Sequence, residues 1–253
     1  MQESASVPEF ITKMEEMAKD GYKGVACNLQ VADNSGNIYY QLLAPMMKRK
    51  VETPYLGCRV LDGRTSKFDW TDKMVPITEL ARSLNPKKGY TSNANNRQAP
   101  DHAKYDYGAT QMSTGRSVRI DELIREGIAA GHKFTPQDMI DIQLDNIDVF
   151  ARNMRPNIVK IAESMRRELT KEQQLNLEQA LVYYRDWNGD MSEDSITGSI
   201  HMHYFMHFFK SLFHKYEPES EDQRMYISDT YAFQQTYQRL LLEVVEEGED
   251  SHF

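Results

Sequence analysis

The sequence has little cysteine, no long apolar run and no excess of positive charge. Each of these absences excludes some classes of function. Its two cysteines, Cys27 and Cys58, allow one disulfide at most, and neither lies in a CxxC or Cys/His pattern typical of zinc sites. We interpret both as buried thiols, with a disulfide as the alternative. The 30 basic and 38 acidic residues give a net charge of -8. Nucleic acid is therefore not expected as a partner, because phosphate binding needs clustered cations.

Signals for membrane insertion and export are also missing. No stretch approaches the roughly 18 uninterrupted apolar residues of a spanning helix. Residues 1–10 lack the basic start and apolar run of a signal peptide. We expect no membrane partner, and the compartment stays unknown. The 253 residues, 40% of them apolar, suffice for one large domain or two modest ones.

The N-terminal part predicts a short helix followed by a β-hairpin. Residues 8–20 place Phe10, Met14 and Met17 at helical spacing, which favours an amphipathic helix. Residues 25–32 and 38–43 are rich in β-formers and flank a five-residue loop, as in a hairpin. From Pro45 to Gly89 little periodicity is visible, which predicts an irregular connector.

After Arg116 helical periodicity dominates. One helix is predicted from a Thr135 cap through Met154, and a second from a capping box at Thr170 to Asn188-Gly189. Residues 196–215 are apolar on all sides, which favours a central helix of a helical region. Another helix is expected over 222–246, followed by an acidic tail.

Three segments in one colinear order carry a resemblance to a known family. They read VADNSGNIYYQL from Val31, TPYLGCRVLDGRTSKFDW from Thr53, and NPKKGYTSNANNR from Asn85. Together they resemble the nucleophile-bearing subunit of the penicillin acylase (penicillin amidase) family of N-terminal-nucleophile hydrolases. Later elements fit the same pattern, including Arg116 with Ile120, the segment 135–138, and Trp187-Asn188-Gly189, where Asn replaces the family's usual Asp.

The resemblance implies an α+β fold and a division of the chain. Residues 1–117 would be a partial, β-containing segment of an αββα N-terminal-nucleophile hydrolase. Residues 118–247 would be helical, and 248–253 would be an acidic tail. In this family an N-terminal Ser attacks an amide carbonyl with its own amine as the base.

The resemblance also implies roles for two residues. Asn95 matches the family's oxyanion-hole residue, and a carboxamide suits that role because it donates a hydrogen bond without titrating. Arg116 matches an arginine that supports the nucleophile, where a fixed cation keeps the amine neutral and basic. Taken without the family, Asn95 is a turn former and Arg116 a surface residue near a helix start.

Calcium is the one cofactor that the resemblance suggests, in a structural role; none is required for the chemistry. Asp106 matches one calcium ligand and the carbonyl of Pro54 another, since hard cations take oxygen ligands. The alternative for Asp106 is the cap of a turn.

The nucleophile is the main departure from the family pattern. Ser4 and Ser6 lie at the wrong distance from Asn95 and follow three other residues. We therefore expect the chain to be inactive alone, with a complementary chain carrying the nucleophile and a linear N-acyl amide, such as a penicillin or an acyl-homoserine lactone, as partners. The alternative is an inactive remnant that serves as a helical binding or scaffold module.

Two further patterns in the segment 196–215 allow alternative interpretations. His203 and His207 have a spacing that can bind metal, but no Glu forms a HExxH motif, and a packed or partly exposed helix face is favoured. An aromatic stripe could serve as a partner or membrane face, but core packing is favoured. It comprises Tyr204, Phe205, Phe208, Phe209 and Phe213.

Overall fold

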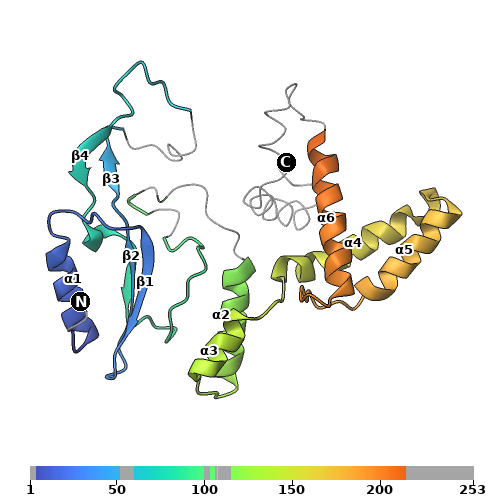
Figure 1. The fold of residues 1–253 in the computed structure, drawn as a ribbon, viewed down its shortest axis with the longest axis horizontal. Coiled ribbons are helices and arrows are strands. Elements are labelled where there is room, and N and C mark those ends of the chain that lie inside the picture. Colours follow the sequence, from blue (N-terminus) through green and yellow to red (C-terminus); the bar gives the residue numbers. More distant parts are fainter. Residues whose placement is uncertain (1–3, 52–59, 100–102, 106, 108–114, 215–253) are drawn as a thin grey trace. The chain divides into compact units, whose positions relative to one another are not determined.

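The chain folds as two compact units, and their strands and helices make the fold α+β, as predicted. The computed structural model describes residues 4–51, 60–99, 103–105, 107 and 115–214. The units comprise residues 1–111, with all the strands found among the described residues, and 112–253, with helices (Figure 1).

The first unit is built on a three-stranded antiparallel sheet. Its order is β1 (Cys27–Ala32), β2 (Ile38–Leu43) and β5 (Arg82–Leu84), with β2 in the centre. The register pairs Cys27 with Leu43 and Ala32 with Ile38, which confirms the predicted hairpin. Cys27 is exposed, so the prediction of a buried thiol is wrong there, because it lies at the open end of an edge strand. Cys58 lies outside the described residues.

Helix α1 (Val7–Met17) packs its apolar side on the sheet. Val7 and Met14 are buried in one core with residues of β2 and of the chain that follows it. Met17 is 71% exposed, contrary to the predicted apolar face. The described buried members of this core, besides the two from α1, are Ala18, Tyr39, Leu43, Val75, Ile77, Leu80 and Tyr105.

The segment predicted as irregular contains regular structure. Strands β3 (Met47–Arg49) and β4 (Trp70–Met74) form a two-stranded ribbon, and a 3-10 helix, η2 (Ile77–Glu79), precedes β5. These elements have three to five residues each, too few for a period to appear in the sequence. The guanidinium of Arg49 lies 3.5 Å from the ring centroid of Trp70 and covers part of that exposed side chain.

The second unit consists of helices joined by short loops. Helix α2 (Gly115–Ala129) contacts α3 (Pro136–Gln143) and α4 (Val149–Met165). Helix α5 (Lys171–Tyr184) contacts α4 and α6 (Ile196–His214). A buried cluster of Ala151, Tyr184 and Trp187 joins α4 to the chain around α5, with Ile200 of α6 packed against it. A short 3-10 helix, η3 (Arg166–Glu168), lies between α4 and α5.

The helix predicted from Thr135 to Met154 is two helices. The Thr135 cap is confirmed, and the structure adds a capping box with Asp138, but α3 ends at Gln143 and α4 begins at Val149 with Asp148 as its cap. Between them, backbone groups bond to another segment: Asp148 N–H donates to the Gly189 carbonyl at 2.8 Å. Short polar side chains in this break compete for backbone hydrogen bonds and interrupt the helix. The predicted cap at Thr170 is also confirmed.

Helix α6 is confirmed, but it is less enclosed than its composition suggested. Phe205 and His201 are buried, whereas Tyr204 is 37% exposed and Phe208 is half-buried. The side chains of Phe209 and Phe213, the predicted helix 222–246 and the predicted tail 248–253 lie outside what the structure describes. None of the described helices combines the length and the apolar character needed to cross a membrane.

Candidate functional site

The loop that carries Asn95 begins at β5 and is attached to the hairpin by Asn85. The Asn85 side chain accepts a hydrogen bond from Ile38 N–H at 2.9 Å and donates one to Asn37 Oδ1 at 3.0 Å. Its own N–H donates to the Ile38 carbonyl at 2.9 Å. Asn85 has a φ of 47°, in the left-handed region that Asn tolerates better than most residues. The start of the loop is therefore set by one side chain.

Further along, three neighbouring asparagines shape the turn at Asn95. Asn95 N–H donates to Asn93 Oδ1 and Ala94 N–H donates to Asn96 Oδ1, both at 3.1 Å. Such local bonds from Asn side chains define Asx-type turns. Asn95 has a φ of 62°, its side chain is exposed, and Ala94 beside it is buried. The turn thus buries Ala94 and leaves Asn95 exposed.

The loop is also tied to the polar face of the sheet. Thr91 Oγ1 donates to Gln30 Oε1 at 2.6 Å, and Gln30 pairs with Tyr40 across β1 and β2. Tyr40 donates to Asn28 Oδ1 at 2.6 Å, and burial raises the pKa of its hydroxyl. These hydrogen bonds join the loop to the sheet through neutral side chains.

Arg116 lies in the first turn of α2 and is exposed. A cation there is disfavoured by the helix dipole, whose N-terminal end is positive. The dipole therefore does not favour an arginine at this position. A permanent cation next to backbone N–H groups can instead raise the local positive potential.

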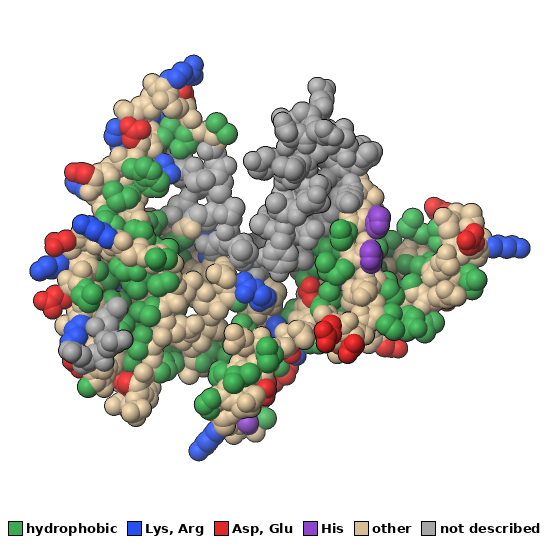
Figure 2. Space-filling model, in the orientation of Figure 1, with side chains coloured by type: hydrophobic (Ala, Val, Ile, Leu, Met, Phe, Trp, Pro, Cys, Tyr) green, Lys and Arg blue, Asp and Glu red, His purple; other side chains and the backbone are tan. Residues whose placement is uncertain are grey.

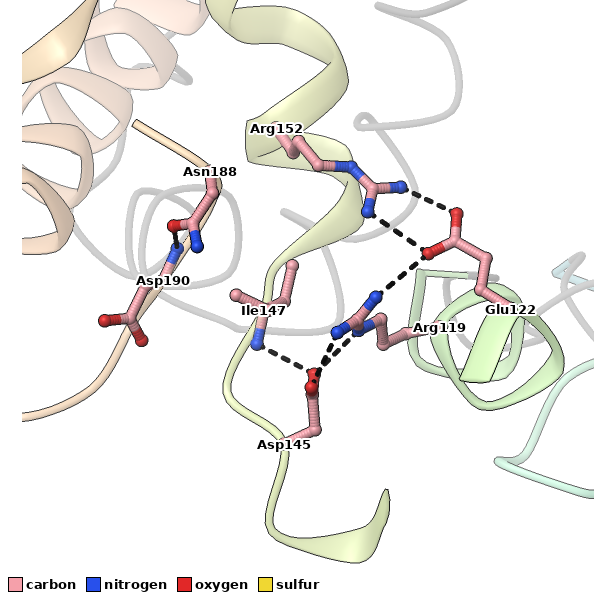
Figure 3. Close-up of polar contacts among 7 residues, drawn as sticks. All are labelled: Arg119, Glu122, Asp145, Ile147, Arg152, Asn188 and Asp190. Carbon is pink, nitrogen blue, oxygen red and sulfur yellow. Dashed lines mark hydrogen bonds and ion pairs between the residues drawn. The ribbon is translucent and has the colours of Figure 1, made fainter. Parts of the chain in front are cut away.

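One turn further along, α2 is fastened by a network of four charged side chains (Figure 3). Arg119 binds Asp145 through two hydrogen bonds of 2.8 Å and Glu122 through one of 3.3 Å. Arg152 of α4 binds Glu122 at 2.6 and 3.1 Å. The Arg119 and Arg152 guanidinium groups hold the pKa values of Asp145 and Glu122 below their usual range. Bidentate ion pairs of this kind fix the relative orientation of the two side chains and also strengthen the interaction between them.

The Trp187-Asn188-Gly189 turn contacts Asp148, the residue that caps α4. Asn188 Oδ1 accepts a hydrogen bond from Asp190 N–H at 3.0 Å, a bond that an aspartate could also accept. The exchange of the family's Asp for Asn is therefore compatible with this turn. Gly189 has a φ of 91°, and an added Cβ would lie 2.6 Å from the Asp148 carbonyl oxygen. Only glycine fits there.

The candidate calcium ligands Asp106 and Pro54 lie outside the described residues. Beside Asp106, Tyr105 donates to Glu79 Oε2 at 2.6 Å and Lys104 pairs with the same carboxylate. Across the described part of the chain, no three His, Cys, Asp or Glu side chains gather in a group that could hold a metal ion. Calcium at Asp106 stays a prediction.

The two predicted catalytic residues belong to different units, Asn95 to the first and Arg116 to the second. The family-like motif includes Asn85 but did not predict its role as an anchor, and residue patterns did not single out the Arg119 network. Only the Arg119–Glu122 spacing of three residues hinted at the network, since opposite charges at that spacing meet on a helix.

Comparison with known proteins identifies the family. The penicillin amidase family model matches residues 2–251, and the chain belongs to this family. No curated protein matches significantly.

Solved structures support the same fold. One of the 34 matching chains is a thermostable penicillin G acylase from Alcaligenes faecalis. It is 18% identical, with a TM-score of 0.61, and the match covers 95% of this chain and 44% of that one. The chain thus spans less than half the length of that solved relative.

Proposed function

We propose that this chain provides oxyanion stabilisation and nucleophile support in an amidohydrolase that cleaves linear N-acyl amides. In this proposal, Asn95 donates a hydrogen bond from its carboxamide to the oxygen that becomes negative when the amide carbonyl is attacked. Arg116 holds a positive charge near the nucleophilic amine and favours its neutral, basic form. The nucleophile comes from residues outside this sequence.

One observation carries the proposal. The chain belongs to the penicillin amidase family, and Asn95, which the resemblance matches to the oxyanion-hole residue, is exposed, has a left-handed backbone and lies in a turn built by its neighbours. Preorganised donors stabilise a developing charge without reorganising at the moment of reaction, so a defined turn suits the role. The position of Arg116 in the first turn of α2 adds support.

The test is hydrolysis of chromogenic phenylacetyl and fatty-acyl anilides by the chain alone and with a complementary polypeptide that carries the nucleophile. Asn95→Gly removes the carboxamide while glycine accepts the left-handed backbone, so the fold should be kept. We expect kcat to fall about 100- to 1,000-fold, the usual effect of losing one oxyanion donor.

Asn34→Gly is the matched control, because Asn34 is an exposed asparagine in the β1–β2 turn. It should leave kcat unchanged. Absence of turnover in both conditions, with a folded chain and a folded partner, would favour the alternative of an inactive remnant that binds or supports other chains.

A further inference from the structure

Helix α6 presents three metal-binding side chains on one face. His203, Met206 and His207 occupy positions i, i+3 and i+4, which lie together on the surface of an α-helix with Cβ atoms roughly 5–6 Å apart. All three side chains are exposed, Met206 by 42%. Histidine side chains appear at the surface over α6 in Figure 2.

The nearby His201 has a different environment and is excluded from this face. Its Nδ1 lies 2.6 Å from the Tyr184 hydroxyl, and the ring is buried and stacked on Phe205. Burial lowers the pKa of this histidine. The His201 ring thus makes its polar contact inside the unit, whereas the imidazoles of His203 and His207 face outward.

The chemistry of these three side chains determines which metal ions they can bind. Two imidazoles suit zinc, nickel and copper, and a thioether adds a preference for copper in its reduced state. Residues 196–214 contain no Asp or Glu, so the helix offers none of the carboxylate oxygens that calcium and magnesium require.

We propose that His203, Met206 and His207 form a surface binding site for a single copper ion, with Cu(I) as the preferred state. The two imidazole nitrogens and the Met206 sulfur occupy three coordination positions, and solvent or an added small ligand occupies the remainder. The site uses none of the residues assigned to amide hydrolysis, and its test does not depend on that activity.

The first measurement is Cu(I) affinity of the untagged full chain, by competition with a chromophoric Cu(I) chelator under anaerobic reducing conditions. Replacing both histidines, His203→Gln with His207→Gln, should weaken binding at least about 100-fold, because two of the three ligands are lost. His132→Gln is the matched control, since His132 is an exposed histidine on another part of the unit, and it should leave the affinity unchanged. An unchanged affinity in the double variant would overturn the site.

The second measurement separates copper from general binding by histidines. Met206→Leu keeps the size and exposure of the side chain but removes the sulfur, so Cu(I) affinity should fall about tenfold while Zn²⁺ affinity stays the same. X-ray absorption of the Cu(I) complex should show sulfur and nitrogen neighbours in the original chain and nitrogen alone in Met206→Leu. Equal Cu(I) affinity or identical spectra in the two chains would overturn the copper assignment.

Discussion

The two units hold their candidate catalytic residues by different means. In the first, the conformation around Asn95 comes from neighbouring asparagines and from the Asn85 anchor on the hairpin. In the second, Arg116 lies on a regular helix that is fastened by charged groups from distant parts of the chain. A donor on a loop thus depends on hydrogen bonds from its neighbours and on the anchor to the hairpin, whereas a cation on a helix depends on the ion pairs that hold that helix.

The largest expected effect tests packing in the helical unit. Gly189→Ala should lower the free energy of unfolding by about 3 kcal/mol, because it adds a left-handed alanine and a clash with the Asp148 carbonyl oxygen. Gly131→Ala is the control, since Gly131 has a φ of +69° and no heavy atom within 4 Å. It should lose only about 1 kcal/mol. Urea unfolding followed by circular dichroism compares them, and equal losses would contradict the close approach at Gly189.

The next effect tests the charged network. Arg119→Ala should destabilise the helical unit by about 2 kcal/mol, between the values for exposed and fully buried ion pairs. Side chains of Arg119 and Asp145 are 19% and 18% exposed. Arg125→Ala, which removes an exposed pair with Asp121 on the same helix, should lose less than about 0.5 kcal/mol. Similar losses in the two variants would show that the network does not fasten α2.

A smaller effect tests the loop anchor in the sheet unit. Asn85→Ala removes two side-chain hydrogen bonds at a left-handed backbone position, and we expect a loss of about 1.5 kcal/mol. Asn95→Gly should lose less than about 0.5 kcal/mol, because glycine adopts that backbone freely. Hydrogen exchange of the β1 and β2 amides measures both. Faster exchange in Asn95→Gly than in Asn85→Ala would reverse the assigned roles.

The smallest expected effects are changes in stability with pH, and they should differ between the two units. Burial lowers the pKa of His201 below 6.5, so its unfolded form binds protons more readily and the helical unit should lose stability as pH falls below 6.5. In the sheet unit, hydrogen bonds led by that from Val7 N–H lower the pKa of Asp33 from 3.8 to about 2. That stabilisation should persist above pH 3.8 and disappear as pH falls towards 2.

Hydrogen exchange at a series of pH values distinguishes the two responses. His201→Gln should flatten the response of the helical unit, and Asp33→Asn that of the sheet unit. His203→Gln, measured with a chelator present, is the control at an exposed histidine. A response of the helical unit that survives His201→Gln would contradict the assignment.

Several elements were predictable because their signals are local. The β1–β2 hairpin follows from two β-rich runs around a short loop, and the Thr135 and Thr170 caps follow from residues three positions apart. The ribbon of β3 and β4 was missed because its strands are short and paired across many residues. The exposure of Cys27 was missed because an edge position depends on neighbouring strands.

The sequence by itself determined the family, through colinear motifs, and most elements that begin at a cap or a turn. Tertiary structure decided which groups the chain between Gln143 and Val149 contacts, because Asp148 N–H bonds to the distant Gly189 carbonyl. It also decided that Arg119 binds Asp145, and that His201 turns inward while His203 and His207 turn outward. Such choices depend on contacts between residues far apart in the chain, and no local pattern contains that information.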